Sequence, residues 1–132
     1  MESKRTKVAV IGVGHLGKEH ARVYSQLPNV ELVGVVDTDR ERGEQVAQRL
    51  NVRFFPSVEE VANKVSAVSI AVPTGAHYSV ASYFLKRRIP VMLEKPLGLS
   101  LREAEELVEL SSTNNVVLQV GHVERFNPAF QA

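Results

Sequence analysis

Short runs of valine and other apolar residues recur along the chain, and longer segments with helical spacing of apolar and polar residues separate them. Within the runs, polar residues hardly alternate with apolar ones, which is typical of parallel strands buried on both faces of a sheet. A shorter run, Val52–Phe55, ends at Pro56 and predicts an edge strand. We expect the other strands at Val8–Val13, Glu31–Val36, Ala67–Val72, Pro90–Leu93 and Val116–Val120.

Three of the intervening segments begin with a Ser or Thr that is followed three residues later by Glu. Side chains at this spacing can satisfy the free amide groups of a helix's first turn. The pairs are Thr38 with Glu41, Ser57 with Glu60, and Ser100 with Glu103. This alternation of strands and helices predicts an α/β fold of the doubly wound Rossmann type, with six parallel strands in the order 3-2-1-4-5-6 and helices on both faces.

A glycine-rich turn follows the first strand and opens a helix over residues 15–27. The turn carries Gly12, Gly14 and Gly17 in the pattern G-x-G-x-x-G. The first glycine permits a tight turn, the second lets a pyrophosphate approach the backbone, and the third lets helix and strand pack closely. The amides at the helix start offer partial positive charge to phosphate. We therefore predict a dinucleotide site that includes His15 and Leu16; the alternative is a turn that binds nothing.

The second strand ends at Asp37, twenty residues after Gly17. A carboxylate there accepts hydrogen bonds from the adenosine ribose and repels a 2′-phosphate, so the pattern favours NAD, with NADP less favoured. Thr38 is expected beside it, and Asp39 inside the start of the helix. Arg40 is a complication, because a nearby guanidinium can tolerate a 2′-phosphate.

Other strand ends carry further candidates, because ligands of such sheets lie beyond the carboxyl ends of the strands. Pro73 stops the fourth strand, and Thr74 either contacts the cofactor or caps the next helix. His77 falls in the first turn of that helix, where the dipole disfavours an imidazolium. It is either a neutral hydrogen-bonding residue near the cofactor or a surface residue.

The fifth strand ends in Glu94-Lys95-Pro96. Pro96 favours an extended Lys95, and the bond between them can be cis. The Lys95 ammonium is placed to bind the nicotinamide ribose or to polarise a substrate oxygen; the alternative is a solvated lysine. After the sixth strand, His122 and Arg125 either face a substrate or belong to a linker. We place the cofactor-binding domain at residues 1–120 and the start of a connection to a second domain at 121–132.

Composition narrows the function classes. The 132 residues include 16 Lys and Arg and 15 Asp and Glu, a net charge of +1 that gathers neither nucleic acid nor an anionic membrane. The chain has no cysteine, which excludes disulfides and thiolate chemistry and suits a reducing cytoplasm. No apolar stretch is long enough to span a bilayer. The histidines lack the carboxylate partners of a metal site, so we expect none.

Taken together, these motifs resemble those of the glucose–fructose oxidoreductase, inositol dehydrogenase and MocA family. The resemblance covers nearly the whole chain, and Glu94-Lys95-Pro96 is its most specific part. The stretch from Gly121 to Pro128 resembles the branch that acts on nucleotide sugars. It reads G-H-V-E-R-F-N-P.

The resemblance implies a Rossmann half followed by an α+β half, which together transfer a hydride between a sugar or polyol carbon and nicotinamide. The lysine that matches Lys95 positions substrate and takes part in proton handling in that family. A small-molecule substrate and a homo-oligomer of the full-length protein are implied as well. The 132-residue chain is expected to bind NAD with little or no turnover. The alternative is a stand-alone NAD(H) sensor without catalysis.

Overall fold

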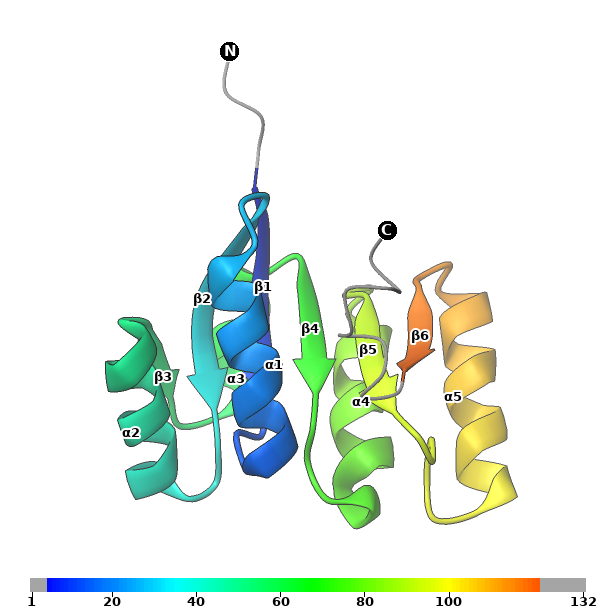
Figure 1. Ribbon diagram of the computed structural model, residues 1–132. Coiled ribbons are helices and arrows are strands. Elements are labelled where there is room, and N and C mark those ends of the chain that lie inside the picture. The colour runs from blue at the N-terminus through cyan, green and yellow to red at the C-terminus, as the bar shows by residue number, and fades with distance from the viewer. Residues whose placement is uncertain (1–4, 122–132) are drawn as a thin grey trace.

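The computed structural model, which describes residues 5–121, contains one sheet of six parallel strands in the order β3-β2-β1-β4-β5-β6 (Figure 1). The predicted Rossmann order is therefore confirmed. The strands are β1 (Thr6–Ile11), β2 (Val30–Val36), β3 (Arg53–Phe55), β4 (Ala67–Ile70), β5 (Val91–Glu94) and β6 (Leu118–Gly121). The helices are α1 (His15–Gln26), α2 (Arg40–Leu50), α3 (Val58–Val61), α4 (His77–Lys86) and α5 (Leu101–Thr113), with short 3₁₀ turns η1 (Ala62–Lys64) and η2 (Thr74–Ala76).

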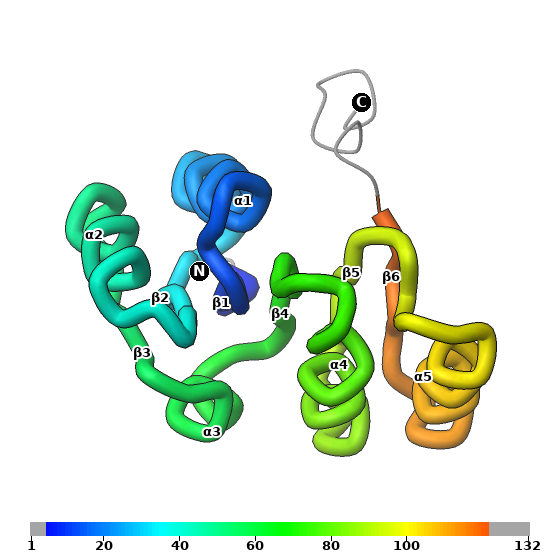
Figure 2. Tube along the Cα trace, turned by 90° about the horizontal axis from the view of Figure 1, so that it is seen from below, coloured from blue at the N-terminus to red at the C-terminus, as the bar shows by residue number. Residues whose placement is uncertain are grey.

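Helices cover both faces of the sheet, as predicted. Figure 2 shows α1 and α2 on one face and α3, α4 and α5 on the other. Alternate residues of β1 serve the two faces, because successive side chains of a strand point in opposite directions. Val8 and Val10 pack in the core beneath α1 and α2, whereas Ala9 and Ile11 pack with Phe84 of α4 in the second core. This explains why β1 carries no polar residue between Val8 and Ile11.

The strand ends differ slightly from the expected ranges. β4 ends at Ile70, and Ala71 adds one more backbone hydrogen bond, from its amide to the carbonyl of Ile11 (2.8 Å). β6 begins at Leu118 and includes Gly121, which pairs with Glu94. Within residues 5–121, no helix is long and apolar enough to cross a membrane.

The three predicted helix starts have three different outcomes. Ser100 caps α5 as expected, since its side chain accepts a hydrogen bond from the Glu103 amide (3.2 Å). Ser57 occupies the cap position of α3, but its hydroxyl donates to the Glu60 carboxylate instead of accepting from an amide. The prediction for Thr38 is wrong. Asp39 caps α2 by accepting from the Arg42 amide, because a carboxylate one residue later is the better placed acceptor.

Candidate functional site

A cleft of about 810 Å³ lies at the carboxyl ends of the strands, where β1 and β4 meet and the order of the strands reverses. Figure 1 shows that α1, α2, α4 and α5 all begin at this same lower edge of the sheet. Six of the predicted cofactor residues line the cleft: Gly12, Gly14, Leu16, Asp37, Thr38 and Pro73. The cleft thus brings the glycine turn and the end of β2 together.

The three glycines of the turn differ in what surrounds them. Gly12 has φ +91°, a conformation that L side chains rarely adopt, and a Cβ there would lie 2.8 Å from the Ala71 carbonyl oxygen. A Cβ at Gly17 would overlap the Gly12 carbonyl, so helix and turn pack in contact. At Gly14 an added Cβ would meet nothing within 4 Å. Gly12 and Gly17 are therefore required by the fold, whereas the space at Gly14 is open for a ligand.

Helix α1 starts directly at this open space. Gly14 is its N-cap residue, and no acidic side chain lies in its first turn to neutralise the positive end of the helix. Leu16 lines the cleft, and His15 is exposed at the helix start. Amides at a helix start without an acidic side chain in the first turn form an environment suited to phosphate.

Asp37, at the end of β2, has a side chain that is only 2% exposed. Its carboxylate accepts hydrogen bonds from two backbone amides, those of Val13 and Asp39, each at 2.8 Å. It also accepts from the Arg42 guanidinium, through Nη2 at 3.0 Å and Nε at 3.3 Å. Burial alone raises the pKa of this carboxyl group, but the bond from Arg42 and the two amides outweigh burial and hold the pKa below its ordinary value. Asp37 is thus an ionised carboxylate held in place at the carboxyl end of β2.

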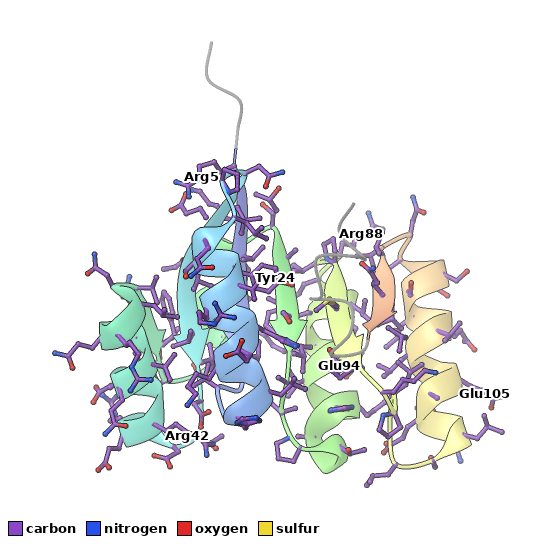
Figure 3. The ribbon with its side chains drawn as sticks, viewed as in Figure 1. Arg5, Tyr24, Arg42, Arg88, Glu94 and Glu105 are labelled. Carbon is purple, nitrogen blue, oxygen red and sulfur yellow. The ribbon has the colours of Figure 1, made fainter. Side chains whose placement is uncertain are left out.

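The arginine beside Asp37 is Arg42, not Arg40. Arg40 forms an ion pair with Glu44 (2.9 Å) and lies over the Phe54 ring. Arg42 lies at the foot of α2 (Figure 3) and lines the cleft. Residues two apart on a helix point to different sides, so Arg42 reaches Asp37 while Arg40 lies against Glu44 and Phe54.

The three residues predicted after the end of β4 lie in different surroundings. Pro73 lines the cleft; Thr74 is half-buried in η2, and its side chain caps no helix. His77 is 3% exposed, with Nδ1 2.7 Å from the Pro96 carbonyl and Nε2 2.9 Å from the Val72 carbonyl. It is therefore neither a surface residue nor part of the cleft wall. It joins the end of β4 to the turn that follows Lys95.

The Glu94-Lys95-Pro96 segment ends β5, and the Lys95–Pro96 bond is cis, as the sequence allows. Lys95 is exposed and lines a separate depression of about 480 Å³ together with Pro96 and Val120. The Glu94 side chain lies at the foot of β5 (Figure 3), with Oε2 3.4 Å from Nε2 of His20. Lys95 and Glu94 thus belong to the same edge of the sheet but not to the walls of the main cleft.

His20 connects α1, the helix that follows the glycine turn, to Glu94 at the end of β5. It is 1% exposed on α1, and its Nδ1 lies 3.1 Å from the Ser69 hydroxyl of β4. Burial lowers the pKa of His20 to about 4, although the charge of Glu19 acts in the opposite direction. The imidazole is therefore neutral at pH 7 and serves to hold α1, β4 and β5 together.

These residues fit NAD. The open space at Gly14 suits a pyrophosphate, and the Asp37 carboxylate in the same cleft is an acceptor suited to ribose hydroxyl groups. Sequence reasoning missed Arg42 and the Ser57–Val58 segment, which also line the cleft. The position of Ser57 and Val58 after the carboxyl end of β3 was the sequence signal that could have placed them in the cleft. His122 and Arg125 lie outside the described residues, and among residues 5–121 no group of His, Asp and Glu is arranged to hold a metal ion.

Comparison with known proteins agrees with this geometry. A family model described as an oxidoreductase family with an NAD-binding Rossmann fold matches residues 6–122. UDP-N-acetylglucosamine 3-dehydrogenase of Acidithiobacillus ferrooxidans is 40% identical over 125 residues, which cover 95% of this chain and 39% of that protein. The NAD-dependent scyllo-inositol 2-dehydrogenase of Bacillus subtilis is 34% identical, with 96% of this chain and 38% of that protein covered. The chain therefore spans about two fifths of the length of these relatives.

Solved structures give the same picture. The Acidithiobacillus ferrooxidans UDP-N-acetylglucosamine 3-dehydrogenase superimposes with a TM-score of 0.88 at 39% identity, over 98% of this chain and 42% of that one. GenD2 from gentamicin A biosynthesis, solved in complex with NAD, superimposes with a TM-score of 0.86 at 34% identity, over 90% and 35% of the two chains.

Proposed function

This chain belongs to the Gfo/Idh/MocA family of oxidoreductases, and on that premise we propose that it holds NAD in a dehydrogenase of sugars, nucleotide sugars or polyols. The observation that carries the proposal is the open space at Gly14, bounded by the start of α1 and in the same cleft as Asp37. The names of the two relatives described above favour an enzyme over a stand-alone NAD(H) sensor.

Each part of the site has a proposed role. The turn from Gly12 to Gly17 binds the pyrophosphate through backbone amides, and Asp37 orients the adenosine ribose. When bound, the nicotinamide supplies the hydride chemistry. Lys95, exposed at the end of β5, is proposed to orient the nicotinamide ribose and a substrate hydroxyl. Lys95 follows β5 at the same edge of the sheet as the cofactor cleft, which supports this role.

For the substrate, we propose a nucleotide sugar, because the relative with 40% identity is named for one. In the same proposal the whole protein is a cytoplasmic homo-oligomer. Since the chain spans about two fifths of its relatives' length, we expect the 132-residue chain to bind NAD and to show little or no turnover. Sugar-dependent formation of NADH by this chain would contradict that expectation.

The cofactor assignment is tested by calorimetric titration of NAD into the wild-type chain and into Gly14→Ala. The added methyl group meets no protein atom within 4 Å, so the fold should be unchanged by circular dichroism. It occupies the space that the pyrophosphate needs, and we expect NAD affinity to fall about tenfold or more, which corresponds to roughly 1.4 kcal/mol.

A matched control is Gly75→Ala, the same substitution at an exposed glycine whose nearest neighbour would lie 4.0 Å from the new Cβ. Gly75 does not line the cleft, and its variant should bind NAD like the wild type. Equal affinities for the Gly14 and Gly75 variants would refute the assignment of the pyrophosphate to this turn.

A further inference from the structure

Both ring nitrogens of His77 face carbonyl oxygens. Nδ1 lies 2.7 Å from the Pro96 oxygen and Nε2 lies 2.9 Å from the Val72 oxygen, at a residue that is 3% exposed. A carbonyl oxygen only accepts hydrogen bonds, and a neutral imidazole carries a single N–H group. In the neutral form, one ring nitrogen would therefore direct its lone pair at a carbonyl oxygen across a short, buried contact.

The imidazolium form satisfies both contacts, because each of its nitrogens donates a hydrogen bond. A change of tautomer does not, since it only moves the lone pair from one carbonyl to the other. The positive end of α4 opposes a cation at this position. That effect is typically smaller than the cost of leaving a buried hydrogen-bonding group unsatisfied, and bonds from a charged donor are stronger than those between neutral groups.

Charged side chains of both signs lie on the elements around the ring. The turn after β5 carries Lys95, which is exposed, and the end of β4 carries no charged side chain. On α5, Glu103, Glu106 and Arg102 all act on Tyr78, the next residue of α4. The groups in direct contact with the ring nitrogens are the two carbonyl oxygens.

The two carbonyls belong to different parts of the site. Val72 lines the cofactor cleft, whereas Pro96 lines the separate depression together with Lys95. An imidazolium thus fastens the cleft wall to the lysine turn through two hydrogen bonds at once. When the ring loses its second proton, one of the two bonds is lost.

We propose that His77 is a positioning residue that carries a proton on both ring nitrogens and so fixes the cleft wall at Val72 to the turn that holds Lys95. The proposal rests on the proposed NAD-binding function, in which the cleft and Lys95 both contact the dinucleotide. NAD should therefore bind more tightly to the chain with the charged ring than to the chain with the neutral ring.

The charge of the ring is tested by a long-range proton–nitrogen NMR spectrum of the wild-type chain at pH 7, which shows whether each histidine nitrogen carries a proton. The His77 signals are assigned through the backbone, so this measurement needs no variant. We expect protons on both nitrogens of His77. The internal control is His20, because burial lowers its pKa to about 4 and its ring is neutral at pH 7. A single N–H group on His77 would overturn the proposal.

The positioning role is tested by calorimetric titration of NAD at pH 6 and pH 8.5. The two chains compared are His15→Gln and His15→Gln/His77→Gln, because an exposed histidine beside the glycine turn can also change its charge in this range. With His77 present, NAD should bind about threefold to tenfold more weakly at pH 8.5, the effect of about one lost hydrogen bond. Without His77, the two affinities should agree within about twofold.

A second measurement does not depend on the folding of the double variant. At pH 8.5, NAD binding to the His15→Gln chain should take up protons, which appears as a difference in binding heat between buffers of different ionisation enthalpy. No proton uptake, or an equal pH dependence with and without His77, would refute the positioning role while NAD binding stands. If the wild type binds no NAD at either pH, the proposed function and the positioning role both fail, and the NMR spectrum still decides the charge of the ring.

Discussion

His77 joins two loops at the carboxyl edge of the sheet, one at Val72 and the other at Pro96. Its ring nitrogens face the carbonyl oxygens of Val72 and Pro96, and the side chain is buried. Each ring nitrogen lies within hydrogen-bond distance of one of these oxygens, so the ring links the two loops directly. The position of the turn after Lys95 therefore depends on a residue outside the cleft.

Replacing His77 by Ala should lower the free energy of unfolding by roughly 2–3 kcal/mol, because it leaves a buried cavity and a carbonyl without its donor. Urea denaturation measures this change. Ser79→Ala is the control: Ser79 is exposed on the same helix, donates only to the Ala76 carbonyl, and should cost less than 0.5 kcal/mol. A loss for His77→Ala as small as the control's would show that the two loops are held by other contacts.

Single residues mark the limit of what the sequence predicts here. The spacing from Gly17 to Asp37 is a property of the chain, and Asp37 lies in the cleft as expected. The contact of Arg42 with Asp37 depends on where α2 begins, and Asp39 caps that helix in place of the expected Thr38. The burial of His77 depends on a turn that is distant in sequence, and no local pattern carries that information.

The helix starts show how similar local patterns fold differently. The Ser100 hydroxyl accepts from the Glu103 amide, and the Glu103 carboxylate accepts from the Leu99 amide (2.8 Å), so α5 has a closed capping arrangement. The Ser57 hydroxyl faces Glu60, and α3 has only four residues. The same Ser-x-x-Glu pattern thus caps a long helix at Ser100, whereas at Ser57 it forms no side-chain cap and only a short helix follows.

The two serines give a paired prediction about elements. Ser100→Ala should lower the free energy of unfolding by about 1 kcal/mol, because it removes the hydroxyl group that accepts from the Glu103 amide at the start of α5. Ser57→Ala should change it by less than about 0.5 kcal/mol, since no amide loses an acceptor. Thermal or urea denaturation of both variants distinguishes these values, and equal losses would contradict the cap geometry.

The strands and helices themselves were predictable, because the apolar runs and the helical spacing that indicate them are strong and recur along the chain. Apolar runs with little polar alternation are typical of strands in a covered sheet, and all six strands lie within two residues of the expected ranges at each end. Their order followed from the alternation with helices and from the rule for crossover connections. Local hydrogen bonds at the helix starts are weaker signals, since neighbouring Ser, Thr and Asp side chains compete for the same amides.

At the scale of the whole molecule, the buried His20 couples stability to pH. Its pKa is about 4 in the folded chain and 6.5 ordinarily, so the unfolded chain takes up a proton more readily. The contribution of the neutral His20 to the free energy of unfolding is complete above pH 6.5. It is lost as the pH falls from 6.5 to 4, by up to about 3 kcal/mol. The lowered pKa of Asp37 acts in a separate window, since that stabilisation is lost only below its ordinary value of 3.8.

Urea denaturation at pH values from 4 to 7 tests this prediction. His20→Asn keeps a polar group near Ser69 but has no proton to gain, and its stability should vary less over this interval than that of the wild type. His15→Asn, on the exposed start of the same helix, is the control and should follow the wild-type curve. Parallel curves for the wild type and the His20 variant would show that His20 does not cause the acid sensitivity.

Strand β1 belongs to both cores, because Val8 and Val10 pack beneath α1 and α2 while Ala9 and Ile11 pack on the other face. Each helix, by contrast, packs in one core only. The glycine turn is the direct continuation of β1, so its backbone inherits the position that the two cores set jointly. A substitution that loosens the packing of β1 on either face of the sheet is therefore expected to displace the glycine turn, which we propose to bind the pyrophosphate. The NAD affinity of such variants would then report on the packing of both cores.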